Sequence, residues 1–149
     1  MDREQRDAFL REQRTCRTAT VSADGRPHVT PLWFAWDGTA LWLYSITRSR
    51  RWAELRRDPR VAVVVDTGED YGELRGVELT GSVARVAEEP RTGLRYDGPE
   101  GLDLAEKLFA EKYGFGAAMV HDGRHAWLRL VPDTLTSWDF AGLGGDFAR

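Results

Sequence analysis

The chain has 149 residues, of which 42% are hydrophobic, and carries a formal net charge of −3. This hydrophobic share excludes a disordered chain, and the length suits one core, so we expect a single domain over 1–149 with its core at about 15–140. The slight negative charge argues against nucleic acid as a partner, because nucleic-acid binders present a basic surface.

The purely apolar runs, such as Val61–Val65, are far shorter than the roughly 20 residues that cross a bilayer, so no membrane partner is expected. Residues 1–6 contain no apolar export segment, which predicts a cytoplasmic location. Cys16 is the single cysteine, so an internal disulfide and a cysteine-based metal cluster are excluded, and a small buried residue is the simpler interpretation.

The first third of the chain predicts one helix and then three antiparallel strands. A short polar helix is expected over Asp2–Glu12, and strands over Arg17–Ser22, His28–Trp36 and Thr39–Ser45. Two Asp-Gly pairs, at 24–25 and 37–38, separate these strands. Their glycines permit the positive φ of tight hairpin turns, so consecutive strands should pair antiparallel.

The pattern changes to helical over Ser49–Arg57, where Trp52 and Leu55 share one face. Proline at position 59 ends this helix, since it excludes the helical conformation at the residue before it. The geometry leaves Arg51 beside the buried edge, whereas Glu54 and Arg57 are expected to point toward solvent.

The remaining elements are mostly strands. Val61–Val65 predicts a strand buried on both faces, and Gly76–Val86 a half-buried strand. A helix is expected over Leu102–Tyr113, followed by a strand at Ala126–Val131 and a last short strand at Thr134–Phe140. Six strands in hairpin order with two or three peripheral helices indicate an antiparallel barrel or rolled sheet of the α+β class.

The segment from Thr47 to Arg51 lies where a strand ends and a helix begins. The first turn of a helix has unpaired N–H groups and partial positive charge, which favour an anion. The hydroxyls of Thr47 and Ser49 with the guanidinium groups of Arg48, Arg50 and Arg51 would complete a phosphate site. A solvated basic helix face is the alternative.

Several segments resemble the pyridoxamine 5′-phosphate oxidase-like superfamily of split β-barrels, namely 20–34, 43–45, 49–52 and 55–61. Residues 74–81 and 137–140 are similar to its deazaflavin- and flavin-dependent reductase branch. The resemblance runs from about Thr20 to Phe140. It implies a six-stranded antiparallel split β-barrel of the FMN-binding type and a homodimer with two cofactor sites at the subunit interface.

The match to the oxidase itself is incomplete. Its flavin-contacting arginine and lysine correspond here to Val29 and Phe34, and no Arg-x-His clamp occurs over 128–137. Oxidation of pyridoxamine phosphate is therefore disfavoured. The phosphate-binding helix start is retained, with Arg51 where the family has lysine, and this combination is typical of the branch that uses the deazaflavin coenzyme F-420.

The resemblance implies where the cofactor lies. Its ring would rest against Thr30–Trp33 and the strand end Tyr44–Thr47, and its phosphate on Thr47–Arg51. Trp138 is a candidate wall, with burial of a barrel end as its alternative. The predicted cofactor-binding residues are Thr30, Pro31, Leu32, Trp33, Tyr44, Ser45, Thr47, Arg48, Ser49, Arg50, Arg51 and Trp138.

The function that follows is an oxidoreductase that transfers a hydride between F-420 and an organic acceptor such as a quinone, enone or tetrapyrrole. The cofactor supplies the chemistry in such enzymes, so no acid–base pair needs to stand out. An FMN-dependent oxidoreductase or FMN-binding protein is one alternative, and a noncatalytic module that carries a cofactor or haem is another.

Three further groups have simpler interpretations. His28 is expected in a structural role beside the cofactor face. His121 and His125 flank a turn, so they would not share a helical face and do not predict a zinc pair. The acidic residues between Asp66 and Glu73 lack the spacing of a calcium loop and indicate a solvated loop.

The aromatic residues Trp33, Trp36 and Trp42 suggest dimerisation independently of the resemblance. Alternation places Trp33 and Trp36 on opposite faces of one strand, and a barrel of this size was not expected to bury both faces alone.

Overall fold

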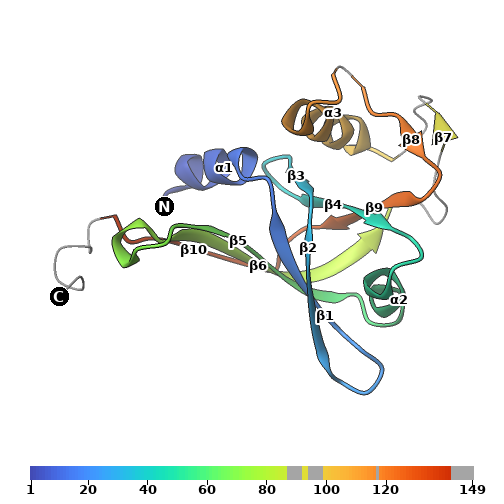
Figure 1. Cartoon of the computed structure of the whole chain (residues 1–149), viewed down its shortest axis with the longest axis horizontal. Coiled ribbons are helices and arrows are strands. Elements are labelled where there is room, and N and C mark those ends of the chain that lie inside the picture. Colours follow the sequence, from blue (N-terminus) through green and yellow to red (C-terminus); the bar gives the residue numbers. More distant parts are fainter. Residues whose placement is uncertain (87–91, 94–98, 117, 142–149) are drawn as a thin grey trace.

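The computed structural model describes residues 1–86, 92–93, 99–116 and 118–141. Its main element is an eight-stranded antiparallel sheet with the order β2-β1-β5-β6-β9-β4-β3, to which β10 is added alongside β6 (Figure 1). The strands are β1 (Cys16–Val21), β2 (Pro27–Leu32), β3 (Phe34–Trp36), β4 (Leu41–Ile46), β5 (Arg60–Thr67), β6 (Arg75–Arg85), β9 (His125–Leu130) and β10 (Thr134–Asp139). Two short strands, β7 (Thr92–Gly93) and β8 (His121–Asp122), pair separately. The predicted α+β barrel architecture is confirmed.

The strand pairing is interrupted at Trp33, and this interruption lets the sheet curl into a barrel. Leu32 pairs with Cys16 of β1, whereas Phe34 pairs with Leu43 of β4. β2 and β3 follow each other in the chain yet lie at opposite ends of the strand order, so the sheet curls until its ends meet. The single strand predicted over His28–Trp36 is therefore two, because the chain changes pairing partner between them.

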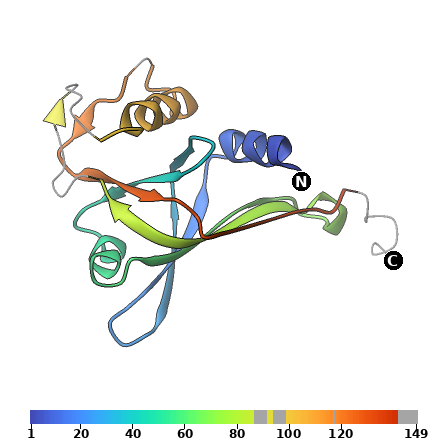
Figure 2. The ribbon, with the colours of Figure 1, turned by 180° about the vertical axis from the view of Figure 1, so that it is seen from behind.

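β6 connects the two halves of the sheet. Its residues 75–82 pair with β5, and its residues 83–85 pair with β9. The β5–β6–β10 part extends away from the rest of the barrel, as Figure 2 shows from behind. On β5, Val61, Val63 and Val65 are buried while Ala62 and Val64 are half-buried, so the prediction that both faces are buried was wrong for the single chain.

Helices form close to their predicted bounds because their ends carry capping residues. α1 (Arg3–Glu12) begins with a capping box between Asp2 and Gln5. α2 (Arg50–Arg57) begins at Ser49, whose hydroxyl accepts from the N–H of Trp52. α3 (Leu102–Tyr113) ends at Gly114 in the left-handed conformation, and a 3-10 turn, η1, spans Tyr71–Glu73. No described helix is both long and apolar enough to cross a membrane.

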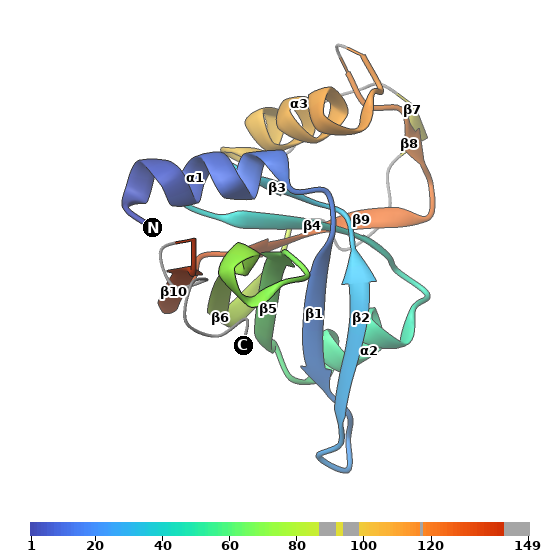
Figure 3. The same cartoon turned by 60° about the vertical axis from the view of Figure 1, so that its left-hand side comes forward.

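Both faces of β3 and β4 are buried within one chain. Trp36 packs in a core shared by six strands with α1 and α2, and its indole Nε1 donates to Asp7. Trp42 packs in a second core under α3, which covers the outer side of β4 and β9 (Figure 3). The expectation of an open face is therefore wrong for Trp36 and Trp42, because the two cores and α3 cover them, whereas Trp33 remains 45% exposed.

Candidate functional site

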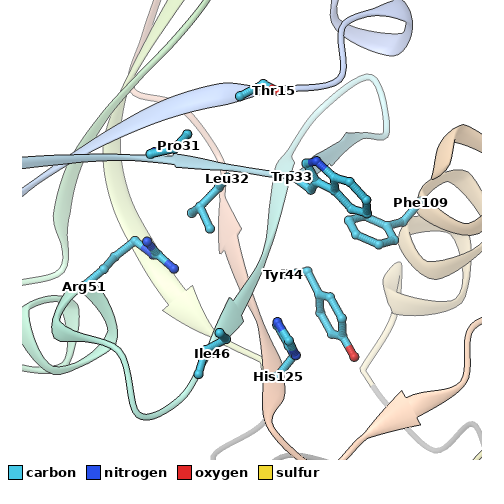
Figure 4. A pocket seen from close by; sticks show the side chains of 9 residues that line it. All are labelled: Thr15, Pro31, Leu32, Trp33, Tyr44, Ile46, Arg51, Phe109 and His125. Atoms are coloured by element: carbon cyan, nitrogen blue, oxygen red, sulfur yellow. The ribbon is translucent and has the colours of Figure 1, made fainter.

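A pocket of about 420 Å³ opens where β2 ends, between β4, β9, α2 and α3. We call it the main pocket. Figure 4 shows Arg51 at one end and the aromatic rings of Trp33, Tyr44 and Phe109 at the other. Its lining residues are Thr15, Pro31, Leu32, Trp33, Tyr44, Ile46, Arg51, Phe109 and His125.

Arg51 supplies the positive charge of the main pocket. The side chain extends from the first turn of α2 and is 8% exposed. Its Nη1 donates to Thr30 Oγ1 over 2.7 Å, and Nε and Nη2 donate to Ser45 Oγ over 3.2 and 3.1 Å. Burial lowers the pKa of the guanidinium below its ordinary value. No ion pair joins it to a carboxylate in the part of the chain that the structure describes, so its charge is available to an anion.

The neighbouring candidates for a phosphate site are directed elsewhere. Arg50 Nε donates to Glu54 Oε1 over 2.8 Å, and the Ser49 hydroxyl caps α2. The hydroxyl of Thr47 donates to the carbonyl of Arg124, and Thr47 and Arg48 line a separate cavity of about 320 Å³. Of the residues predicted over 47–51, Arg51 alone lines the main pocket.

Glu54 corrects the expected orientation of α2. The carboxylate is buried instead of facing solvent, and it accepts from Thr20 Oγ1, His28 Nδ1 and Arg50 Nε. Burial alone would raise the pKa of Glu54, but these hydrogen bonds outweigh it and lower the pKa to about 2. His28 thus takes the structural role that the sequence predicts, beneath α2. Arg57 is exposed as expected and donates to the carbonyl of Val21.

The predicted ring-binding residues come together in the main pocket. Pro31, Leu32 and Trp33 form one wall and Tyr44 lies opposite, while Thr30 and Ser45 stand behind them as partners of Arg51. The indole of Trp33 stacks on Tyr113 with centroids 4.2 Å apart and planes 5° apart. The hydroxyl of Tyr113 accepts from the N–H of Phe34 and donates to the carbonyl of Arg14, so the wall is held firmly.

Trp138 lies apart from the other predicted residues. It is on β10, opposite Gly76 of β6, and it does not line the main pocket of its own chain. Cys16 is fully buried as predicted, and burial raises the pKa of its thiol to about 11.

Three pocket residues were not predicted from the sequence, namely Thr15, Phe109 and His125, whereas Ile46 lies in the strand end expected to hold the ring. Phe109 and His125 come from α3 and β9, far from the recognised segments, and only the closed fold brings them here. The imidazole of His125 stacks on Tyr44 at 4.7 Å, and its Nδ1 lies 2.6 Å from Asp122 Oδ2.

His121, the other histidine that flanks this turn, lies apart from the main pocket. His121 is buried and lies 3.2 Å from Glu106 of α3. Within the described ranges, no three His, Cys, Asp or Glu side chains gather where they could hold a metal ion.

Comparison with solved structures supports the fold. A conserved hypothetical protein from Mycobacterium tuberculosis is 30% identical, with a TM-score of 0.76 over 97% of this chain and 88% of that chain. An FAD-binding protein from Mesorhizobium loti is 19% identical, with a TM-score of 0.66 over 92% of each chain. A protein described as an F-420 reductase is 21% identical, with a TM-score of 0.61 over 87% of this chain and 94% of that chain. The last two likenesses show the fold alone.

No curated protein matches the chain in sequence. The family model described as pyridoxamine 5′-phosphate oxidase matches residues 2–139, nearly the whole of the described barrel. Together with the split barrel and its closure at Trp33, this match shows that the chain belongs to the pyridoxamine 5′-phosphate oxidase family.

Proposed function

We propose that the main pocket binds a phosphorylated cofactor of the deazaflavin or flavin class and that the protein transfers a hydride between this cofactor and an organic acceptor. The observation that carries the proposal is Arg51, a buried guanidinium held by two hydroxyls at one end of a pocket whose other end is aromatic. A planar ring with a phosphate group matches both ends.

The residues present fit such a group. Arg51 would pair with the phosphate, because a guanidinium whose partners are neutral hydroxyls gains a charge-assisted contact from an anion. Trp33 and Tyr44 would flank the ring, and their fixed stacking on Tyr113 and His125 presents flat surfaces without rearrangement. When bound, the cofactor would supply the hydride chemistry, while the chain binds, orients and shields it.

F-420 is the favoured cofactor and FMN the alternative. This order is based on the departure from the oxidase pattern. The uncharged residues Val29 and Phe34 stand where the oxidase has its flavin-contacting arginine and lysine. Val29 is exposed on β2, and Phe34 is fully buried in the core. The M. loti structure is named as FAD-binding and the other as an F-420 reductase. These names support a cofactor of the flavin or deazaflavin class but do not favour F-420 or FMN.

We further propose that the protein is a homodimer whose second copy covers the sheet face beside the pocket. Val29, Ala19 and Ala62 are cross-strand neighbours on this face, which no described element covers: Val29 is 64% exposed and both alanines are partly exposed. Two residues after Val29, Pro31 lines the main pocket. A partner seated on this face would therefore also help to enclose the cofactor.

To test the proposal, the purified chain is titrated with F-420 and, separately, with FMN, and the fluorescence of the cofactor reports binding. We expect at least one of the two cofactors to bind at micromolar affinity or better, and we expect F-420 to bind more tightly than FMN. Turnover is then measured with the reduced cofactor and a panel of quinones, enones and biliverdin. Binding without consumption by any acceptor would identify a noncatalytic carrier, and binding of neither cofactor would refute the proposed function.

A further inference from the structure

A second, smaller cavity adjoins the main pocket on the side away from Arg51. We call it the side chamber. It has a volume of about 270 Å³ and is lined by Trp33, Tyr44, Phe115, Met119, Val120, Asp122 and His125. Trp33, Tyr44 and His125 also line the main pocket, so the two cavities share a wall.

The side chamber is mostly apolar. Phe115 is 53% exposed and Val120 is 68% exposed at its edge, and Met119 is buried behind them. Such surfaces favour a flat hydrocarbon ring over a charged ligand. The polar groups of this wall are Asp122 and His125.

Asp122 fixes which hydrogen-bonding group His125 presents. Its Oδ1 accepts from the backbone N–H groups of Arg124 and His125, and its Oδ2 lies 2.6 Å from His125 Nδ1. Burial raises the pKa of Asp122, but these hydrogen bonds outweigh it and leave the pKa below its ordinary value. An ionised carboxylate only accepts, so Nδ1 carries the proton.

The opposite ring nitrogen, Nε2, is then a hydrogen-bond acceptor in the neutral imidazole. It has no hydrogen bond to any residue that the structure describes, and the side chain is 24% exposed. Figure 4 shows the His125 ring beside Tyr44, with a ring nitrogen turned toward the main pocket.

We propose that the side chamber binds a planar aromatic ligand whose hydroxyl group lies at the wall shared with the main pocket, where Nε2 of His125 accepts its hydrogen bond. The inference rests on the proposed function, since it assigns the class of the second ligand at the same site. A hydroquinone, formed when a quinone takes up a hydride and a proton, belongs to this class.

A matched pair of probes tests the proposal on the full chain without cofactor. 2-Naphthol and 2-methylnaphthalene have nearly the same size and shape, but only the first has a hydroxyl. We expect 2-naphthol to bind about five- to tenfold more tightly, the contribution of one hydrogen bond. Equal affinities, or no binding of either probe, would overturn the proposal.

Variants identify the acceptor. His125→Phe preserves a ring against Tyr44 and should bind both probes equally. Asp122→Asn should reduce the preference and increase the fraction of His125 with its proton on Nε2, which nitrogen chemical shifts report. A preference that survives His125→Phe would show that His125 is not the acceptor. A neutral His125 that carries its proton on Nε2 in the wild-type chain would also contradict the proposal, because Nε2 could not then accept a hydrogen bond.

Failure here is separable from failure of the proposed function. Arg51→Ala should weaken cofactor binding yet keep the preference for 2-naphthol, because Arg51 lines the main pocket and not the side chamber. If the cofactor binds but the probes do not discriminate, only the side-chamber inference fails.

Discussion

Arg50 and Arg51 are neighbours in the first turn of α2, yet their guanidinium groups enter different environments. A step of one residue rotates a helical side chain by about 100°. The exposed Arg50 consequently reaches along the helix to the buried carboxylate of Glu54, one turn later. Arg51 instead turns inward to Ser45 and Thr30. The same residue type thus pairs with a carboxylate of the helix at one position and lines the proposed anion site at the next.

The hydrogen bonds around Glu54 predict a pH-dependent stability. Its pKa is about 2 in the folded chain and near the ordinary 4.5 when unfolded, so its contribution is present above about pH 4.5 and lost as pH falls toward 2. Glu54→Gln should lower the free energy of unfolding by about 1–3 kcal/mol at pH 7. The variant should also lose less stability than the wild type between about pH 5 and pH 2.5.

Denaturant titrations across this pH range provide the measurement. Glu78→Gln, which removes an exposed carboxylate on β6, is the matched control and should follow the wild-type curve. If the Glu54→Gln and wild-type curves run parallel down to the acid limit, the carboxylate does not hold the network together.

At the scale of single elements, local signals explain what the sequence predicts well. α1 and α2 begin at side-chain caps, and α3 ends at a left-handed glycine. Gly25 and Gly38 have the positive φ angles of 83° and 98° expected for the two Asp-Gly turns. These features depend on residues a few positions apart, and they are readable without the fold.

Other features depend on contacts between distant segments, and the sequence does not reveal them. The break at Trp33 arises because β2 and β3 pair with different strands, and the burial of Glu54 requires Thr20 and His28 from the β1–β2 hairpin. Likewise Phe109 and His125 enter the main pocket only after α3 and β9 are placed. The family resemblance pointed to one wall of the pocket, Pro31 to Trp33, to Arg51 and to Tyr44 on the opposite side, but not to Phe109 and His125.

The pairing of β6 with β10 depends on a glycine. Gly76 lies opposite Trp138, whose ring covers it so closely that an added Cβ would clash with the ring. Gly76→Ala should therefore lower the free energy of unfolding by about 1–3 kcal/mol. In a Trp138→Leu background the same substitution should have less than half this effect. Urea denaturation of the four proteins measures the difference, and an equal effect in both backgrounds would show that Trp138 is not the obstacle.

At the scale of the whole molecule, one sheet face suggests a partner. Of the three tryptophans that suggest dimerisation, Trp36 and Trp42 are buried within the chain and Trp33 is 45% exposed. The face around Val29 now carries this inference. We predict a dimer of about twice 16.9 kDa in sedimentation velocity at tens of micromolar.

Substitution distinguishes this face from exposed apolar residues elsewhere. Val29→Glu should shift the chain toward the monomer, because a carboxylate would be buried without a partner. Leu104→Glu, at an exposed position on α3, should leave the dimer intact. A wild-type monomer, or an equal response to the two substitutions, would rule out this interface.

The proposed function depends on Arg51 holding the phosphate of a bound cofactor. The most direct measurement compares cofactor affinity in Arg51→Ala and Arg57→Ala, titrated at one ionic strength, with circular dichroism to verify folding. Both substitutions remove one positive charge from α2, but Arg57 is exposed and bonded to Val21. We predict a loss of about one to two decades in affinity for Arg51→Ala and almost none for Arg57→Ala. Equal losses would mean that α2 contributes only a diffuse positive field, which would contradict the proposed role of Arg51.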